Sequence, residues 1–381
     1  MEGLLLPNQA LDRLENTLRQ GKDSLCWSLV EDLGLNHSEV LLHQLPESLA
    51  LIQASRQRVQ EKCTRFSTVG AWIEGPDLMR SVFRVLSAAI AAGNEEVWLG
   101  LPEDAHQFTG LLQLLMRPTG IGLRVVRSSP EPFVASCLGQ VHTLLVQGEP
   151  RWIEGWEPVF ARWGMRVQFE GPGHDAMMIF GDADPDRAAE LILEASLRNS
   201  GRDPSAPHRI YTAHSIYSRL SQALIRQAGQ LRLGPPQEAT SDLGPLPEED
   251  LRAVLERLDQ AFSDGARVQY GGEPIECTEN GKRGLPPTIV TGCRPQMDLV
   301  REPCRGPLIA LVGFDDTEEG IQHACASRGG HALSILGASD ISTDKLSTHY
   351  GRIFRDSTPF REESYGERIR WGADASTSWI W

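Results

Sequence analysis

The hydrophobic pattern of the chain changes near residue 69. Before that point leucines recur at helical spacing, as at Leu11, Leu14 and Leu18, and this period predicts helices over residues 9–62. After it, short apolar runs alternate with longer amphipathic stretches. The runs at 69–73, 97–99, 123–126 and 143–146 predict buried strands, and the stretches at 78–92 and 156–163 predict helices between them.

The same alternation continues through the second half of the chain. Helices are predicted at 185–197, 216–229, 248–264 and 317–326, and strands at 209–211, 308–312 and 332–336. From about residue 346 the sequence is polar, until it ends on Ser378-Trp379-Ile380-Trp381. Strands that alternate with helices in this way predict an α/β fold with doubly wound sheets.

Composition narrows the class of protein. A net charge of −14 over 381 residues, without a basic cluster, argues against nucleic acid as a partner. The seven cysteines are dispersed and form no Cys-x-x-Cys pair, so we expect no metal site and reduced thiols, as in a cytoplasmic protein. No apolar run approaches the ~20 residues of a membrane span, and no basic segment precedes the first leucines as in a secretion signal.

Short motifs follow one another in a fixed order from residue 169 onward. Residues 169–174 read Phe-Glu-Gly-Pro-Gly-His, and residues 179–184 read Ile-Phe-Gly-Asp-Ala-Asp. Glycine and proline markers follow at Gly234-Pro235-Pro236, Gly244-Pro245, Gly265, Gly271-Gly272, Gly284, Pro287 and Gly306-Pro307. The series resembles the aldehyde dehydrogenase superfamily, where Glu-Leu-Gly-Gly-Lys and Ile-Val-x-x-Asp-Ala-Asp precede the same markers. No single motif is specific, but their shared order and spacing make the resemblance strong.

The resemblance implies an aldehyde-dehydrogenase-like fold of two doubly wound, Rossmann-like α/β domains. Residues 1–169 would form a cofactor-binding-like domain with N-terminal helices, and residues 170–345 a catalytic-like domain. Residues 346–381 would be a C-terminal tail for docking or oligomerisation. Residues 63–68 lead almost directly into the first strand, where the family has an extra hairpin that builds its oligomer. We therefore do not expect the family's usual tetramer.

The family's nucleophile segment, Asn-x-Gly-Gln-x-Cys followed by Arg-Val, corresponds to residues 199–210. The cysteine position falls on Pro204, which has no thiol to attack an aldehyde. Among the cysteines, Cys304 is the least implausible substitute, although a buried apolar role fits it better. The base position keeps its carboxylate at Glu170. Two interpretations stay open for Glu170: a retained catalytic or ligand role, or a domain-junction residue held by hydrogen bonds.

The other requirements of the reaction are also missing. No asparagine donor to an oxyanion occurs in residues 72–77, Trp-Ile-Glu-Gly-Pro-Asp. The family's phosphate turn corresponds to Gly148 and Glu149, and a carboxylate beside a diphosphate would cost about 1–4 kcal/mol at ~4 Å. The ribose-binding lysine falls near Pro102, which cannot replace it, and the nicotinamide-ribose clamp falls on Pro303 and Arg305. We therefore expect no cofactor; if any binds, NAD or NADP is implied.

Several other features have ordinary structural explanations. The tripeptide Phe-Thr-Gly at 108–110 spells the family's phosphate turn, but it follows the wrong strand and is expected inside a helix. His174 and His208 are expected to be solvated loop histidines. The acidic clusters at 248–250 and 315–319 are expected at helix starts, where the helix dipole favours them.

These losses, with the fold markers retained, indicate a non-catalytic aldehyde-dehydrogenase-like pseudoenzyme with a structural or partner-binding role. Two alternatives remain: an NAD(P)-dependent oxidoreductase of divergent mechanism acting on an aldehyde or acyl substrate, and a small-ligand sensor using the remnant cleft. The expected partner is a protein, either a second copy or a catalytically active relative. Trp379, Ile380 and Trp381 are the predicted contact residues, because apolar residues at a chain end usually pack against something.

Overall fold

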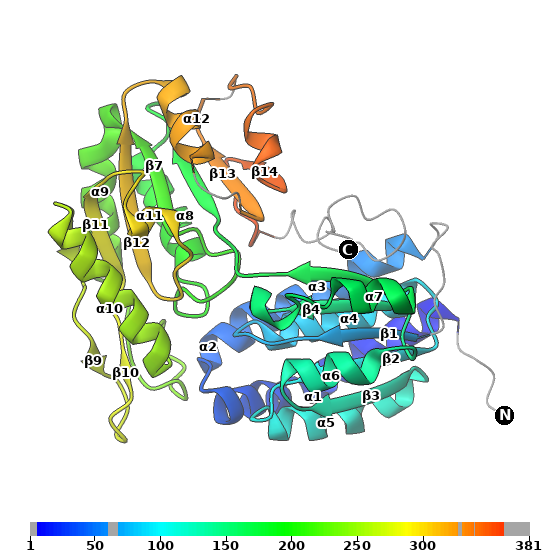
Figure 1. The fold of residues 1–381 in the computed structure, drawn as a ribbon. Coiled ribbons are helices and arrows are strands. Elements are labelled where there is room, and N and C mark those ends of the chain that lie inside the picture. Colours follow the sequence, from blue (N-terminus) through cyan, green and yellow to red (C-terminus); the bar gives the residue numbers. More distant parts are fainter. Residues whose placement is uncertain (1–5, 60–67, 327–329, 339, 362–381) are drawn as a thin grey trace. The chain divides into compact units, whose positions relative to one another are not determined.

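The computed structural model describes residues 6–59, 68–326, 330–338 and 340–361 and divides into two compact units (Figure 1). Among the described residues, unit 1 extends to Gly171, and unit 2 comprises Pro172–Arg361. The predicted boundary after residue 169 lies slightly too early, because the last strand of unit 1 pairs with its neighbour as far as Glu170. The predicted contact residues Trp379, Ile380 and Trp381 lie outside the described residues.

Unit 1 opens with helices and continues as alternating strands and helices, as the pattern predicts. The first helix starts on a proline and stops at Gly34, whose φ of 65° suits a left-handed helix cap. The elements of unit 1 are α1 (Pro7–Leu33), α2 (His37–Glu39), the π-helical turn Val40–Gln44, α3 (Leu45–Arg58), β1 (Thr68–Trp72), α4 (Leu78–Ala91), β2 (Glu96–Leu101), α5 (His106–Met116), the 3-10 turn Arg117–Thr119, β3 (Gly122–Arg127), α6 (Pro130–Cys137), β4 (Thr143–Gln147), the 3-10 turn Pro150–Trp152, α7 (Glu157–Trp163) and β5 (Arg166–Glu170).

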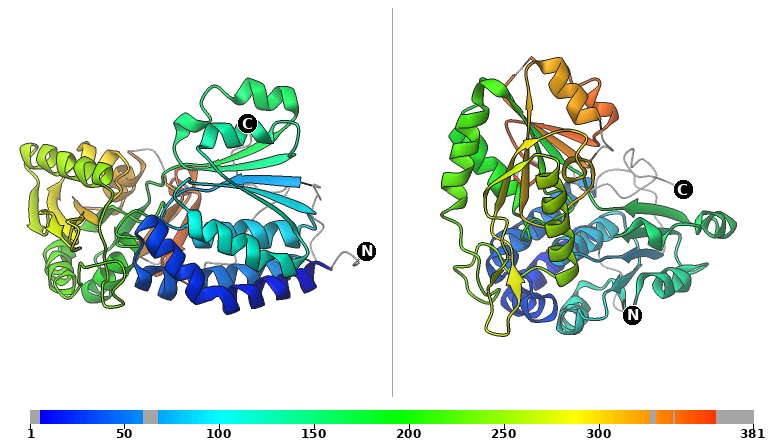
Figure 2. Two further views of the ribbon diagram at one scale, coloured as in Figure 1. Left: turned by 90° about the horizontal axis from the view of Figure 1, so that it is seen from below. Right: turned by 60° about the vertical axis from the view of Figure 1, so that its left-hand side comes forward.

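The five strands of unit 1 form one parallel sheet in the order β3-β2-β1-β4-β5. Helices cover both faces, as Figure 2 shows, and this is why the strands read as continuous apolar runs. Ala71 and Ile73 pack with α1, α3, α4 and α5 on one face. Trp72, between them in sequence, packs with α6 and α7 on the other.

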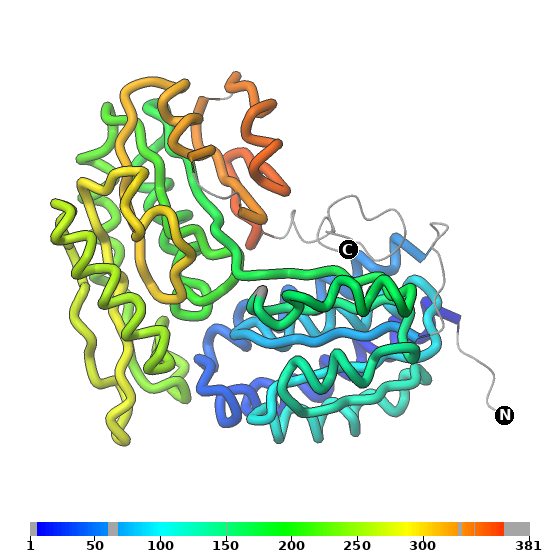
Figure 3. Tube along the Cα trace, viewed as in Figure 1, coloured from blue at the N-terminus to red at the C-terminus, as the bar shows by residue number. Residues whose placement is uncertain are grey.

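Unit 2 is built on a seven-stranded sheet in the order β14-β13-β6-β7-β12-β11-β8, parallel except for β8. One apolar core lies under α8 and α9, and a second lies under α10, α11 and α12. Beyond β8 the chain leaves the sheet as a hairpin beside α10, drawn in yellow in Figure 3. The elements of unit 2 are β6 (Ala176–Ile179), α8 (Pro185–Ser196), β7 (Arg209–Ala213), α9 (His214–Ala228), α10 (Glu248–Ser263), β8 (Arg267–Tyr270), β9 (Ile275–Glu276), β10 (Arg283–Gly284), β11 (Thr288–Cys293), α11 (Asp298–Arg301), β12 (Leu308–Phe314), α12 (Thr317–Cys325), β13 (Ala332–Leu336), the 3-10 turn Leu346–Thr348 and β14 (Arg352–Arg355).

The predicted doubly wound α/β fold is confirmed. The pattern does not predict β5, β6, β8 or β11, and the tail also differs from its prediction. Residues 346–361 belong to unit 2, because β14 adds an edge strand beside β13. The tripeptide at 108–110 lies inside α5, as expected. Within the described part of the chain, no helix has both the length and the apolar character needed to cross a membrane.

Candidate functional site

The nucleophile position lies in a tightly packed loop between α8 and β7. Asn199 and Ser200 adopt left-handed backbone angles, with φ of 53° and 58°, and Gly201 follows with φ of 74°. A Cβ added at Gly201 would overlap the carbonyl of Gly306, so only glycine fits there. The close approach explains the glycine at position 201. At Gly306 an added Cβ would instead lie 2.7 Å from the side chain of Val254.

Pro204 itself is part of this packing. Its carbonyl lies against Gly173, where a Cβ would overlap it. The preceding Asp203 accepts a hydrogen bond from the amide of Ser205 at 2.9 Å, which closes a local turn. The position that the sequence resemblance assigns to the family's thiol is therefore a fixed turn in this chain.

The expectation that His174 and His208 are solvated is wrong. Each is only 4% exposed. The Nε2–H of His208 lies 2.9 Å from the carbonyl of Gly201 and 3.1 Å from that of Gly306, and it holds the two loops together. Burial lowers the pKa of His208 to about 4 and that of His174 to about 3. Both imidazoles are neutral at pH 7 and serve as structural hydrogen-bonding groups.

No activated thiol replaces the missing cysteine in the described part of the chain. Burial raises the pKa of all six cysteines that it contains. For Cys304 the value rises to about 11. A thiol that stays protonated at neutral pH is a poor nucleophile. The seventh cysteine, Cys63, lies outside the described residues.

Glu170, the predicted base position, forms an ion pair with a guanidinium from its own unit. Arg84 on α4 binds both carboxylate oxygens of Glu170 in a fork, and Gln168 donates to the same carboxylate at 3.2 Å. The two charged side chains are only 18% and 20% exposed. Burial opposes the charge on Arg84, but the carboxylates of Glu170 and Asp77 outweigh it and raise its pKa above the ordinary value. A carboxylate held in this way is a poor general base.

Residues 72–77, where no oxyanion donor is expected, end at Asp77, which belongs to a second buried ion pair. Asp77 accepts from Arg80 at 2.7 Å and from the hydroxyl of Ser81 at 2.8 Å, and Arg80 also binds Glu47 at 3.0 Å. Burial alone would raise the pKa of Asp77, but Arg80, Ser81 and Arg84 hold it below its ordinary value. The end of β1 therefore carries an anion with fixed partners, which is unsuited to stabilising a developing oxyanion.

The phosphate turn after β4 is filled by an aromatic ring. Gly148 has a φ of 137°, and a Cβ added there would overlap the indole of Trp152. Residues 150–152 form a 3-10 turn, and α7 begins only at Glu157. The helix N-terminus that would receive a diphosphate directly after this glycine is therefore absent.

The segment that corresponds to the nicotinamide clamp is tied to α10. The carbonyl of Pro303 accepts a hydrogen bond from Arg257, and Arg305 lies 3.5 Å from the carboxylate of Asp250. Neither residue offers the carboxylate and aromatic pair that the clamp needs. The residues present therefore do not fit a dinucleotide bound in the family's manner. Among the described residues, no group of three or more His, Cys, Asp or Glu side chains could hold a metal ion.

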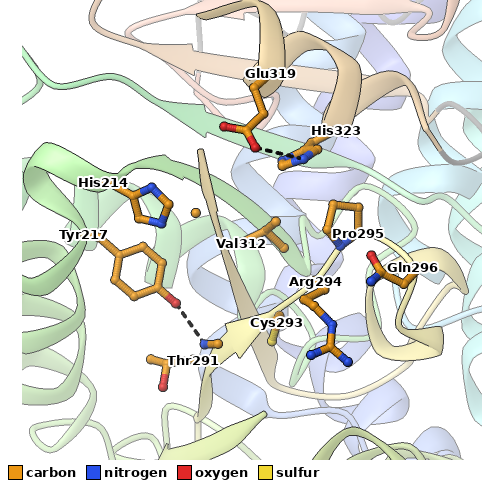
Figure 4. Close-up of a pocket in the computed structure, with 12 residues that line it drawn as sticks. His214, Tyr217, Thr291, Cys293, Arg294, Pro295, Gln296, Val312, Glu319 and His323 are labelled. Carbon is orange, nitrogen blue, oxygen red and sulfur yellow. Dashed lines mark hydrogen bonds and ion pairs between the residues drawn. The ribbon is translucent and has the colours of Figure 1, made fainter. Parts of the chain in front are cut away.

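A separate pocket of about 560 Å³ lies at the carboxyl ends of β7, β11 and β12 (Figure 4). Pro204 precedes β7, so the pocket is at the opposite end of that strand from the nucleophile position. In Figure 4, Glu319 and His323 face the pocket from one side and His214 from another. Glu319 pairs with His323 at 3.7 Å, and His214 with Asp315 at 2.9 Å. These side chains therefore already have partners within the protein.

Arg84 and Trp152 are the important residues that sequence reasoning missed. Arg84 carried a signal, because it is a cation on a strongly apolar helix, between Phe83 and Val85, and such a residue usually has a buried partner. Trp152 carried none. Its contact with Gly148 depends on the 3-10 turn at residues 150–152, which the sequence pattern did not predict.

Comparison with known proteins identifies the family and the fold. The model of the aldehyde dehydrogenase family matches residues 156–350, just over half of the chain. The structure resembles an NADP-dependent enzyme of E. coli, with a TM-score of 0.83, 22% identity, and coverage of 93% of this chain and 78% of that one. It also resembles aldehyde dehydrogenase C of Pseudomonas syringae, solved with NAD+ and octanal (TM-score 0.82, 21% identity, coverage 92% and 77%). A third match is betaine aldehyde dehydrogenase of Staphylococcus aureus with NAD+ (TM-score 0.82, 19% identity, coverage 92% and 75%). This protein therefore belongs to the aldehyde dehydrogenase family.

Proposed function

We propose that this protein is a non-catalytic member of its family with a structural or partner-binding role. The observation that carries the proposal is the nucleophile loop. Pro204 stands at the thiol position within a fixed turn, and the described cysteines have raised pKa values. Without a thiolate, no covalent intermediate with an aldehyde can form by the family's chemistry.

The ion pair between Arg84 and Glu170 supports the same proposal. A general base must be able to take a proton from water, and this carboxylate is already held by two charge-assisted hydrogen bonds. The alternative of a divergent NAD(P)-dependent oxidoreductase draws on relatives whose structures contain NAD+. It is less favoured, because the phosphate turn of this chain is filled by Trp152.

The partner in this proposal is a protein, either a second copy of the chain or an active relative. The terminal Trp379, Ile380 and Trp381 are the proposed contact, because aromatic and β-branched residues favour strand addition to another sheet. The resemblance to the family adds support, since the family's C-terminal segment reaches a neighbouring subunit.

An activity assay tests the non-catalytic role. Wild type and Pro204→Cys are incubated with a generic aldehyde and either NAD or NADP, beside an active relative as the positive control. We expect no reduced dinucleotide from wild type or from the variant, because catalytic groups act as a unit and a thiol alone does not restore them. Turnover by wild type would refute the proposal. Turnover by Pro204→Cys alone would show that the other groups are less damaged than proposed.

A further inference from the structure

The contact between Trp152 and Gly148 is part of the apolar core of unit 1. Trp152 is 8% exposed, and its ring meets that of Trp72 edge-on at 6.3 Å between centroids. Trp72 in turn packs against Gly100, where a Cβ would lie 2.6 Å from its ring. Gly148 therefore makes room for Trp152, and Gly100 for Trp72. The indole of Trp152 lies between Gly148 and the ring of Trp72.

The backbone around the turn is also engaged. The amide of Gly148 donates to the carbonyl of Glu170 at 2.9 Å, and the amide of Trp152 donates to the carbonyl of Glu149 at 3.1 Å. The helix that follows has only seven residues and carries a glutamate in its first turn. Both amides are therefore already used within the protein and do not point toward a bound phosphate. The short helix α7, with a glutamate in its first turn, adds little favourable dipole for an anion.

A phosphate at this turn would need the space that the ring now fills. Glycine at such a position allows the backbone to approach a diphosphate closely. Here the side of Gly148 on which a Cβ would stand is covered by the indole. The ring would have to leave the core, and separate from Trp72, before any phosphate could approach. Protein interiors are close-packed and contain few voids, so moving an indole out of the core costs free energy.

We propose that Trp152 is an internal plug that closes the phosphate turn of unit 1 to dinucleotides. Steric filling by the indole, rather than the charge of Glu149, is the element that excludes the ligand. The inference rests on the proposed non-catalytic function. It deepens that proposal by naming the residue that prevents the dinucleotide from binding.

Single substitutions separate the two possible causes of exclusion. Trp152→Ala removes the ring and keeps the charge, whereas Glu149→Ser removes the charge and keeps the ring. Trp163→Ala is the control for loss of an indole that packs on a different glycine of unit 1. A Cβ added at Gly139 would lie 2.7 Å from the ring of Trp163, and Trp163 is 55% exposed. Binding of NAD and of AMP is measured by calorimetry and by the shift in melting temperature.

We expect no saturable binding at millimolar ligand for wild type, Glu149→Ser and Trp163→Ala. Trp152→Ala should bind with an affinity at least about tenfold above that detection limit, a difference of about 1.4 kcal/mol. The double variant Glu149→Ser/Trp152→Ala should bind more tightly still, because the remaining repulsion is removed.

Binding by wild type or by Glu149→Ser alone would overturn the plug, as would a folded Trp152→Ala that binds no better than wild type. Equal gain in Trp163→Ala would show a general loosening of unit 1 instead. Trp152→Leu keeps an apolar but smaller side chain in case the alanine variant fails to fold. If neither folds, Glu149→Ser still decides, since binding by it contradicts the steric cause and its absence supports it. Failure of the plug shows as dinucleotide binding by wild type or Glu149→Ser, or as no gain in a folded Trp152→Ala. Failure of the proposed function shows instead as aldehyde turnover by wild type.

Discussion

Removal of Arg84 should destabilise unit 1 strongly, because it leaves Glu170 without its counter-ion. Both side chains are about four-fifths buried and share a forked ion pair. Loss of one partner from a fully buried pair costs about 3–5 kcal/mol, whereas an exposed pair contributes at most about 1 kcal/mol. For Arg84→Met, which keeps most of the aliphatic length, we expect a loss of about 2–4 kcal/mol.

The double variant Arg84→Met/Glu170→Leu should recover most of that loss. Two apolar side chains in place of a buried ion pair leave no charge without a partner. Recovery should be incomplete, because Arg84 also attracts Asp77.

Tryptophan fluorescence during urea unfolding reports on unit 1. Six tryptophans lie in residues 1–171, none in 172–361, and the other three at 371, 379 and 381. Arg19→Met is the matched control, since Arg19 pairs with Glu15 one helical turn away and its side chain is 52% exposed. Equal losses for Arg84→Met and Arg19→Met, or a coupling energy below about 1 kcal/mol in the double-mutant cycle, would contradict the reasoning.

Two further predictions concern unit 2 and the tail. Burial lowers the pKa of His208 to about 4 from about 6.5 in the unfolded chain, so the unfolded state takes up the proton first and stability falls as the pH drops from about 6.5 toward 4. This difference in pKa corresponds to about 3 kcal/mol of stability. His208→Asn should remove this part of the pH dependence, which urea unfolding followed by circular dichroism measures at several pH values. Parallel curves of stability against pH for variant and wild type would argue against it. Deletion of residues 376–381 should abolish assembly with the partner, since each buried tryptophan at such a contact contributes roughly 2 kcal/mol or more. Light scattering and a pull-down with an active relative measure this, and unchanged mass and recovery would show that the tail has no docking role.

The sequence predicts the architecture well because strands buried on both faces leave a strong apolar signal, as in residues 69–73 and 308–312. It missed the edge strands β5, β8 and β14, which have weaker burial. It also missed β6 and β11, which lie inside the sheet of unit 2 and are short or interrupted by a glycine. The site was harder to predict, because its contacts join residues far apart in the chain. Arg84 meets Glu170 at a separation of 86 residues, and His208 meets Gly306 at 98. Such pairings follow from the packing of whole elements and leave little trace in local pattern.

Glu170 and Gly148, which the sequence resemblance assigns to the family's site, have partners within unit 1. A buried carboxylate without a ligand needs a counter-ion, and Glu170 has Arg84. Space beside a glycine without a phosphate would be a cavity, and Trp152 fills that beside Gly148. Catalysis by the family's chemistry needs a carboxylate that is free to accept a proton and an empty space beside the glycine of the phosphate turn. In the proposed role, each of these residues stabilises the fold at the expense of catalysis. Variants that reopen either position should therefore lose stability, whether or not they gain a ligand.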